Sequence, residues 1–493
     1  MGGNKLGNKL GNKVENKLGR ADFIKKAALA TAGFYIVPRS VLGGVGYVAP
    51  SDKLNIAAIG CGGEGDNDIQ HLANTPNKNS NIAFLCDVDE RPAASKRKQF
   101  PKAKFYKDWR EMFDKESKHF DAVTVAIPDH NHALVGLSAM QLKKHLYLQK
   151  PLTHDIYEAR ILTQAAEKYK VVTQMGDQGA SCDGMRTMRE WFEADLIGDI
   201  EKVYCWTDRP VWPQGIAWPK TKPPIPKELN WDLWLGTAQK TNYIDNLVPF
   251  NWRGWWEFGT GALGDMGCHI MGPPFKLLEL GYPTEISGSA STVYSGIFKE
   301  AVYPESGPLS SSLKFKFKQK NGKDLDLFWM DGGITPERLN ELDPELNSND
   351  ALGDFPGEND FEGATLFIGT KGKVACGWGG SHPRLLPLSL NKDVNIPEKY
   401  ARVKGNMDGH WWQWVDASIA GYGNMEVDSP FVGYAGPLTE TVLLGNLLLR
   451  SFNIREKIKR VDPVYGNMEG YKFSGRYKAL KWDGENMRVT NFE

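Results

Sequence analysis

The chain has 493 residues, and its 60 basic side chains are balanced by 60 acidic ones to a formal net charge of zero. This length predicts two domains, and the balanced charge excludes the extended basic surface of a nucleic-acid-binding protein. Hydrophobic residues make up 41% of the chain and charged residues 24%, which indicates a soluble globular protein and excludes a disordered polymer.

Residues 1–50 are predicted to form an export signal with a low-complexity extension. Residues 4–19 repeat Asn-Lys-Leu-Gly, which gives nothing to pack. The uncharged run at residues 27–38 follows basic residues, and its length is about half of the roughly 20 apolar residues that a membrane span needs. Residues 19–26 resemble a twin-arginine signal with a single arginine. We therefore expect a periplasmic protein without a membrane span, with an amphipathic cytoplasmic helix as the alternative.

The next segment carries a dinucleotide fingerprint. Residues 54–59 (LNIAAI) have the length and apolarity of a buried strand, and a Gly-x-Gly-x-x-Gly sequence follows directly. Glycines fit a tight turn, a close approach of backbone to a pyrophosphate, and the packing of the following helix on the strand. The predicted cofactor-binding residues of this loop are Gly60, Gly62, Gly63, Glu64 and Gly65.

A second strand, residues 81–86, ends at Asp87, which lies 22 residues after Gly65. At this spacing a carboxylate accepts hydrogen bonds from the adenosine ribose and repels a 2′-phosphate, so the cofactor is predicted to be NAD rather than NADP. Asp89 and Glu90 are neighbouring acids that could share this role.

Two further strands bring polar residues to the same edge of the predicted sheet. Residues 120–127 lead into Pro128-Asp129-His130-Asn131-His132, and residues 145–149 lead into Lys150-Pro151. Ligands of open α/β sheets bind at the carboxyl ends of the strands, and a following proline restricts the backbone of Lys150. We expect the cofactor to contact Pro128, His130, His132 and Lys150.

Together these motifs resemble the Gfo/Idh/MocA oxidoreductases, whose signature joins a Rossmann fingerprint, a Pro-x-x-x-His loop and a Glu-Lys-Pro turn. The matching segments are residues 60–65, 128–132, 149–151, 261–269 (GALGDMGCH) and 367–372 (FIGTKG). The resemblance extends from about residue 54 to about residue 453. One position departs from the family: Gln149 stands where glutamate is usual, which removes a negative charge beside Lys150.

The resemblance implies hydride transfer between nicotinamide and a carbinol carbon of a sugar-like substrate. In the helix that the family implies over residues 264–280, Asp265 and His269 lie one turn apart on one face. We expect His269 to act as the general base, Asp265 to orient it, and Lys150 to stabilise the developing negative charge on oxygen. No metal is predicted, because two candidate ligands without a third are weak evidence for a site.

Eight of the 16 tryptophans fall between residues 206 and 256, in a proline-rich stretch that predicts a long ordered loop over the site. Aromatic faces suit the C–H faces of sugars, although burial in the core or a subunit interface is the alternative for any one tryptophan. The residues predicted to bind substrate are Arg209, Trp218, Arg253, Trp255 and Trp256.

Strands predicted at residues 284–293, 312–317 and 324–330 indicate a second domain. The family implies that this domain is built on a large, mainly antiparallel sheet that often pairs subunits. The predicted fold is therefore an N-terminal doubly wound Rossmann domain (51–178) followed by a C-terminal α/β domain (179–493). A homo-oligomer, a dimer or a tetramer, is expected, since an exposed apolar sheet face needs cover.

Three functions fit the sequence. The first is an NAD-dependent dehydrogenase that oxidises a secondary hydroxyl of a sugar or glycoside, with C3 as one position. The second is a redox-neutral, NAD-dependent glycosidase that uses transient C3 oxidation and elimination of the aglycone. The third is a sugar-binding protein without turnover.

Overall fold

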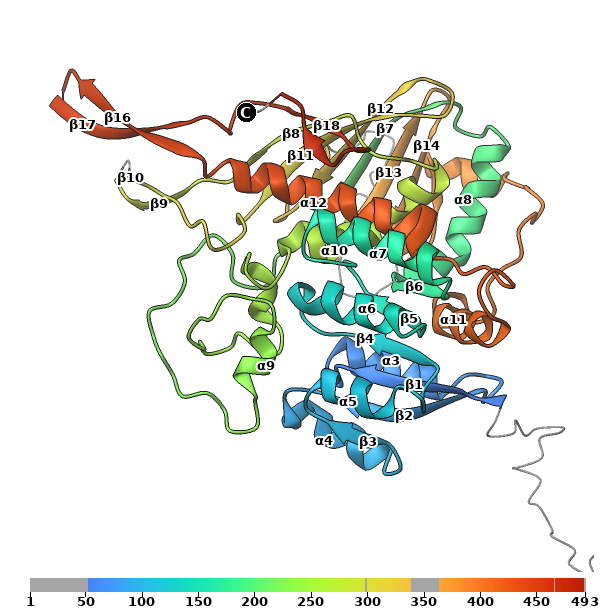
Figure 1. Cartoon of the computed structure of the whole chain (residues 1–493). Helices are drawn as coiled ribbons and strands as arrows, with labels where there is room; N and C mark the ends of the chain where they lie inside the picture. The colour runs from blue at the N-terminus through green and yellow to red at the C-terminus, as the bar shows by residue number, and fades with distance from the viewer. Residues whose placement is uncertain (1–51, 298, 338–362, 465, 492–493) are drawn as a thin grey trace, which may run out of the picture. The chain divides into compact units, whose positions relative to one another are not determined.

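The computed structural model describes residues 52–297, 299–337, 363–464 and 466–491 (Figure 1). The export signal and low-complexity extension expected at residues 1–50 lie outside the described residues. From residue 53 onward the chain forms one compact unit. No helix among the described residues has the length and apolarity needed to cross a bilayer. All six cysteines are described, and each is free and buried.

The first half is a parallel six-stranded sheet in the order β3-β2-β1-β4-β5-β6. The order reverses between β1 and β4, which is the point where an open α/β sheet binds its ligand. The four strands predicted in this half are confirmed: β1 and β5 have the expected bounds, β2 begins one residue earlier, and β4 is two residues shorter at each end. β3 and β6 were not predicted. The strands are β1 (Leu54–Ile59), β2 (Ser80–Cys86), β3 (Lys104–Tyr106), β4 (Ala122–Val125), β5 (His145–Gln149) and β6 (Thr173–Gly176).

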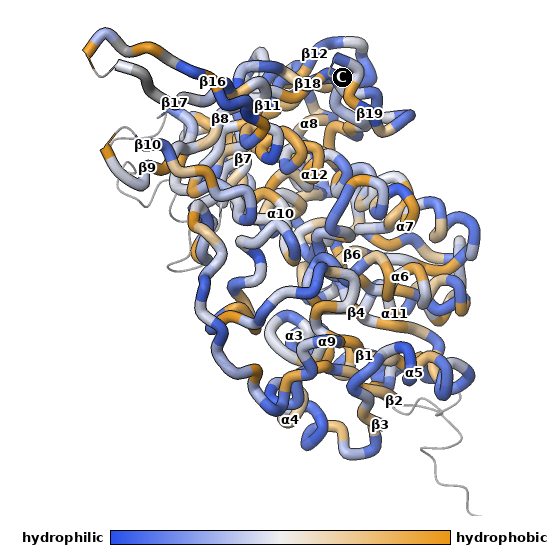
Figure 2. Tube along the Cα trace, turned by 60° about the vertical axis from the view of Figure 1, so that its left-hand side comes forward, coloured by the Kyte–Doolittle hydropathy of each residue, from blue (hydrophilic) through white to orange (hydrophobic). Residues whose placement is uncertain are grey.

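Helices cover both faces of this sheet because alternate strand residues point to opposite sides. Ile56 and Ala58 of β1 belong to a core with residues of α3, α4 and α11, whereas Ala57 and Ile59 belong to a core with residues of α5, α6 and α7. Figure 2 shows the hydrophilic course of α4 on the outside of the sheet. The helices are α3 (Glu64–Ala73), α4 (Glu90–Gln99), α5 (Trp109–Glu116), α6 (His132–Gln141), α7 (Ile156–Tyr169) and α11 (Gly409–Ala420).

The described residues of the second half form a nine-stranded sheet in the order β15-β14-β13-β7-β12-β11-β8-β18-β19. Only the β7–β12 pair is parallel, so the predicted mainly antiparallel sheet is confirmed. Its strands are β7 (Ile200–Trp206), β8 (Glu285–Ala290), β11 (Ser311–Lys318), β12 (Asp324–Met330), β13 (Ala364–Gly369), β14 (Lys373–Gly377), β15 (Arg384–Leu386), β18 (Leu480–Asp483) and β19 (Arg488–Val489).

Two buried helices, α10 (Gly261–Leu277) and α12 (Gly436–Ser451), pack on each other beside this sheet (Figure 1). Leu313, Phe315 and Phe317 of β11 alternate with more exposed lysines and join Val442 and Leu444 of α12 in one core. α10 is thereby fixed on the sheet, and its first turns reach the carboxyl ends of the Rossmann strands, where they contribute to the cavity described below. The remaining α-helices of the described residues are α8 (Asp183–Glu193) and α9 (Trp231–Leu235).

Two hairpins extend from the second half. The longer one, β16 (Arg455–Asp462) and β17 (Gly466–Phe473), projects as a two-stranded ribbon beyond α12, and the shorter one is β9 (Val293–Gly296) with β10 (Lys299–Ala301) (Figure 1).

Candidate active site

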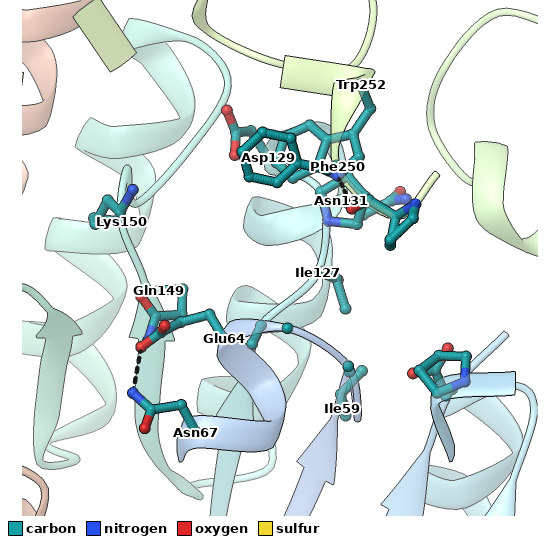
Figure 3. Close-up of a pocket in the computed structure, with 18 of the residues that line it drawn as sticks. Ile59, Glu64, Asn67, Ile127, Asp129, Asn131, Gln149, Lys150, Phe250 and Trp252 are labelled. Atoms are coloured by element: carbon teal, nitrogen blue, oxygen red, sulfur yellow. Dashed lines mark hydrogen bonds between the residues drawn. The ribbon is translucent and has the colours of Figure 1, made fainter. Parts of the chain in front are cut away.

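A cavity of about 770 Å³ lies at the carboxyl ends of the Rossmann strands. One wall carries the loops after β1, β2, β4 and β5, and the other carries the first turns of α10 and the loop around residues 233–253. Figure 3 shows Gln149 and Lys150 on one side of the cavity, with Asp129, Phe250 and Trp252 opposite them. Among the described residues, no group of three His, Cys, Asp or Glu side chains is placed to hold a metal ion.

Lys150 is held at the exit of β5 by α10. Its Nζ donates to the carbonyl oxygen of Asp265 at 2.7 Å and to Asp265 Oδ1 at 3.0 Å. An ammonium group has three donors, so these bonds within the described residues leave one N–H to point at a ligand. The side chain is 14% exposed, and a cation in so dry a place interacts strongly with an opposing negative charge.

Asp265 serves two cations. Besides Lys150, it accepts a hydrogen bond from Arg253 Nε at 2.9 Å. Burial alone would raise the pKa of the Asp265 carboxyl, but the charges and hydrogen bonds of Lys150 and Arg253 outweigh burial and hold that pKa well below its usual value. Asp265 therefore stays ionised across the physiological range and fixes both cations.

The partner of His269 is Asp177, and the predicted pairing of His269 with Asp265 is wrong. His269 Nδ1 donates to Asp177 Oδ1 at 2.8 Å, and Tyr434 donates its hydroxyl to Asp177 Oδ2 at 2.8 Å. The spacing of Asp265 and His269 does bring both side chains to the cavity, but the two cations occupy Asp265. Because a carboxylate only accepts, Nδ1 carries the proton and Nε2 is the basic nitrogen.

Asp129 is a buried acid on the cavity wall that the sequence analysis did not assign to the site. Its Oδ2 accepts a hydrogen bond from the Thr260 hydroxyl at 2.7 Å. Burial raises the pKa of Asp129 to about 6, although the hydrogen bond from Thr260 and the charge of Arg253 act in the opposite direction. The cavity thus holds a carboxyl group that changes protonation state near neutral pH.

The loop after β1 fits a dinucleotide. A Cβ on Gly60 would lie 2.0 Å from the carbonyl oxygen of Ala126, and Gly60 has φ of 90°, so only glycine fits this turn. A Cβ on Gly65 would lie 2.4 Å from the carbonyl oxygen of Gly60, which confirms that Gly65 lets α3 pack closely. Gly62, Gly63 and Glu64 line the cavity at the N-terminus of α3, where the helix dipole favours phosphate.

Asp87 lies where the ribose of such a ligand is expected. It follows β2, lines the cavity, and accepts hydrogen bonds from the backbone N–H groups of Cys61 and Asp89 at 2.8 and 2.9 Å. Burial raises the pKa of Asp87 to about 6, with these backbone hydrogen bonds acting in the opposite direction.

Two residues predicted to bind the cofactor, His130 and His132, are not among the residues that line the cavity. His130 lies between the carbonyl oxygens of Phe258 and Trp234, and His132 lies between those of Pro151 and Ile127. Both rings are buried, and burial lowers their pKa values to about 4. They fix the loops after β4 and β5, whereas Pro128 of the same motif lines the cavity.

Some of the residues predicted to bind substrate line the cavity, and the others do not. Arg209 and Arg253 line the cavity. Trp218, Trp255 and Trp256 do not act as walls of the described cavity: Trp218 stacks edge-on against Trp255 at 4.7 Å between ring centroids, and Trp255 and Trp256 are at most 8% exposed. Large rings in a proline-rich loop bury each other first, which composition alone does not reveal. The aromatic residues on the wall include Trp109, Trp234, Phe250, Trp252, Trp378 and Trp411.

Gln149, the position that departs from the family, is paired with a buried acid. Its Nε2 donates to Asp68 Oδ1 and Oδ2 at 2.8 and 3.0 Å, and Trp411 Nε1 donates to Asp68 Oδ1 at 2.8 Å. Burial, and then the Glu64 carboxylate, raise the pKa of Asp68. Gln149 is thus held by a carboxyl group of α3, and Trp411 of α11 in the C-terminal half completes the arrangement.

Asp177 was not among the predicted site residues, and its position at the end of a strand is the signal that could have identified it. It follows β6, another strand whose carboxyl end reaches the cavity edge, and the same rule that selected Asp87 and Lys150 selects it. Asp68, Trp378, Trp411 and Tyr434 have no comparable signal, because they reach the site only through tertiary packing.

The fold and site define a dinucleotide-binding α/β protein with an acid–base pair in its ligand cavity. Residues 54–177 match the model of the Gfo/Idh/MocA oxidoreductase family, NAD-binding Rossmann fold, and residues 203–287 match the C-terminal alpha/beta domain of this family. Residues 54–177 are therefore an NAD-binding Rossmann domain of this family, and the start of the C-terminal half is similar to the family's second domain.

Among curated proteins, the chain is similar to levoglucosan dehydrogenase of Pseudarthrobacter phenanthrenivorans, with 21% identity over 188 residues. This match covers 38% of the chain and 40% of the relative. An uncharacterized oxidoreductase of Streptococcus pneumoniae is 26% identical over 109 residues, 22% of the chain and 29% of the relative. The chain thus matches less than half the length of these curated relatives.

Solved structures share the fold over most of their length. An NAD binding oxidoreductase from Klebsiella pneumoniae has a TM-score of 0.52 at 17% identity and covers 81% of this chain and 98% of its own. WlbA dehydrogenase from Bordetella pertussis, in complex with NADH and UDP-GlcNAcA, has a TM-score of 0.51 at 15% identity, over 80% of this chain and 96% of its own. Levoglucosan dehydrogenase, in complex with NADH and levoglucosan, has the same score and identity over 81% and 98%.

The raised pKa of Asp87 predicts pH-dependent cofactor binding. Above about pH 6 the carboxyl is ionised and accepts ribose hydroxyl hydrogen bonds; below it the group is protonated and accepts them poorly. We expect the dissociation constant of NAD, measured by calorimetry, to be about tenfold higher at pH 5 than at pH 7. Asp87→Asn should remove most of this dependence, and an unchanged pH slope in that variant would refute the assignment.

The Gln149–Asp68 pair predicts a specific rescue. In Gln149→Glu, two carboxyl groups face each other in a buried place, and we expect the free energy of unfolding to fall by about 3 kcal/mol. The double variant Gln149→Glu, Asp68→Asn restores a donor facing an acceptor and should recover most of the loss in urea unfolding. A double variant no more stable than Gln149→Glu would show that the two residues are not coupled.

Proposed function

We propose that the protein is an NAD-dependent oxidoreductase that oxidises and reduces a secondary hydroxyl group of a carbohydrate. The observation that carries this proposal is that Lys150 and His269 line the same cavity while each is fixed by its own carboxylate, Asp265 and Asp177. Lys150 is a hydrogen-bond donor that Asp265 holds in place, and His269 has a basic nitrogen, Nε2. An alcohol oxygen between them meets both the groups that its deprotonation requires.

Gly60, Gly62 and Gly63 at the N-terminus of α3 would hold the diphosphate of NAD, and Asp87 its adenosine ribose. When bound, NAD supplies the acceptor for the hydride of the carbinol carbon. In the oxidation direction, His269 Nε2 takes the hydroxyl proton, and Asp177 stabilises the imidazolium that forms. The remaining N–H of Lys150 donates to the oxygen as its negative charge develops. Asp265 keeps the ammonium group in place throughout.

Two observations favour a carbohydrate as the substrate. The cavity wall combines aromatic rings, among them Phe250 and Trp252, with the cations Arg209 and Arg253 and the acid Asp129. Aromatic faces pack on the C–H faces of sugars, while charged groups select hydroxyls. The curated relative named levoglucosan dehydrogenase adds a sugar-oxidising protein with a similar sequence.

Redox-neutral glycoside hydrolysis is the second candidate, and Asp129 is the observation that favours it. A reaction that oxidises C3, eliminates the aglycone, adds water and re-reduces C3 needs an acid for the leaving oxygen as well as the base. Asp129 lines the same cavity, and burial raises its pKa to about 6, so a part of the population is protonated at neutral pH. Oxidation at C3, export to the periplasm and a homo-oligomer remain predictions.

Substitutions in the two pairs test the proposed chemistry. We expect Lys150→Ala to lower kcat by about 100-fold to 1000-fold, and Asp177→Asn by about 100-fold, because each removes stabilisation of charge that forms in the transition state. Initial rates with NAD and a panel of sugars and aryl glycosides measure the loss, and calorimetry checks that NAD still binds. Lys227→Ala, at a side chain that is 91% exposed, is the matched control.

Product analysis separates the candidates in the same assay. Accumulation of a keto sugar with NADH supports the dehydrogenase, and release of the aglycone without net NADH supports the hydrolase. A Lys150→Ala variant with unchanged turnover would contradict both catalytic candidates, and sugar binding without any turnover would favour a binding protein.

A further inference from the structure

His269 and Trp378 both line the cavity, and they mark the start of one of its ends. The ring of Trp378 lies beside that of His269, with 4.6 Å between centroids and 48° between planes. Beyond Trp378 the wall passes to α11 and to the exposed side of α3, where His71, Asp408 and Trp411 line the cavity.

Hydrogen bonds and one close His–Asp contact connect the side chains of this end of the cavity on two sides. On one side, Gln178 Nε2 and Asn67 Nδ2 donate to Glu64 Oε1 at 3.3 and 3.1 Å. On the other, His71 Nε2 lies 3.3 Å from Asp408 Oδ1.

Backbone contacts close the remaining gaps. His71 Nδ1 donates to the carbonyl oxygen of Asn67 at 3.0 Å, and the backbones of Gly179 and Gly379 touch, since a Cβ on Gly179 would lie 2.3 Å from the Cα of Gly379. These contacts connect most of the residues that line this end of the cavity. We call it the distal compartment; its wall is Glu64, Asn67, His71, Gln178, Trp378 and Asp408.

The dinucleotide would occupy the adjoining part of the cavity, which meets the distal compartment at Glu64, the first residue of α3. Its diphosphate belongs at the N-terminus of α3 and its adenosine beside Asp87. Asn67 and His71 lie about one and two turns further along α3, and Asp408 comes from the segment before α11. The Glu64 carboxylate, which would repel a phosphate, accepts hydrogen bonds from Asn67 and Gln178 of the distal compartment and from Gln149.

The wall of this compartment has the chemistry of a sugar subsite. Trp378 is partly exposed and offers a ring to a C–H face. Glu64 and Asp408 are exposed carboxylates that accept hydrogen bonds from hydroxyls, and the amides of Asn67 and Gln178 provide both donors and acceptors. A purely apolar group would leave these polar groups unpaired.

We propose that the distal compartment binds a second sugar ring, so that the substrate is a disaccharide or a longer saccharide whose reacting ring lies between Lys150 and His269. This inference rests on the proposed function. Because Trp378 contacts His269, the second ring lies next to the reacting one, and its binding energy positions the reacting hydroxyl.

The test compares aglycones on the same sugar. The full-length protein with NAD is assayed with methyl, phenyl and glycosyl derivatives of glucose, galactose and N-acetylhexosamines in both anomers, by initial rates and by calorimetric binding. For the sugar that reacts, we expect kcat/KM to be at least about tenfold higher for the disaccharide than for the methyl glycoside, the effect of one good charged hydrogen bond.

Asp408→Asn then probes the subsite. The Asp408 side chain is 64% exposed and makes no capping hydrogen bond to α11, so the substitution should leave that helix intact. We expect the ratio of kcat/KM for disaccharide over methyl glycoside to fall about tenfold. Asp393→Asn, at an exposed acid away from the cavity, should leave this ratio unchanged.

Each outcome decides the proposal. An equal kcat/KM for disaccharide and methyl glycoside, or a ratio unaffected by Asp408→Asn, overturns the subsite while leaving the oxidoreductase intact. A phenyl glycoside that matches the disaccharide shows a compartment for an apolar ring and overturns the sugar subsite. If NAD binds but no member of the panel binds or reacts, the proposed carbohydrate function fails, and the subsite fails with it.

Discussion

Separate carboxylates hold Lys150 and His269, the two side chains to which we assign the chemistry, and the rest of the site depends on that separation. Lys150 belongs to the Rossmann half and is fixed by Asp265 of α10, whereas His269 belongs to α10 and is fixed by Asp177 of the Rossmann half. Both pairs join the two halves. The Rossmann half supplies the lysine of one pair and the carboxylate of the other. A shift of α10 relative to the sheet would break both pairs together, so the packing of α10 on the second sheet is what sets the geometry of the cavity.

Sequence reasoning was reliable where a rule links position to geometry. The strand ends of an open α/β sheet located Gly60, Asp87 and Lys150, and helical spacing brought Asp265 and His269 to one cavity. It assigned the wrong partner to His269 because a spacing of four residues places side chains on one face but does not say what else competes for them. Two cations from other elements pair with Asp265, and the sequence around Arg253 does not indicate that it is one of them.

The tryptophan-rich loop shows the same limit. Its length and position over the site followed from the sequence, but which rings face the cavity depends on how the loop packs on itself, and Trp255 is buried where Trp252 is on the wall. The C-terminal segment is a further case. α11 lies more than 300 residues from α3 in the chain, yet Trp411 contacts Asp68 and thereby Gln149. The surroundings of Gln149 can be explained only when that long-range contact is included.

The account's central claim is that a carbinol of a sugar is placed between Lys150 and His269 opposite the nicotinamide. It is tested most directly by following a deuterium atom bound to the carbon of the reacting hydroxyl through a single turnover, with mass spectrometry of sugar and cofactor. The account predicts that the deuterium appears in the reduced nicotinamide together with a keto sugar or, in the redox-neutral reaction, returns to the same carbon. Deuterium found in the solvent would contradict the account.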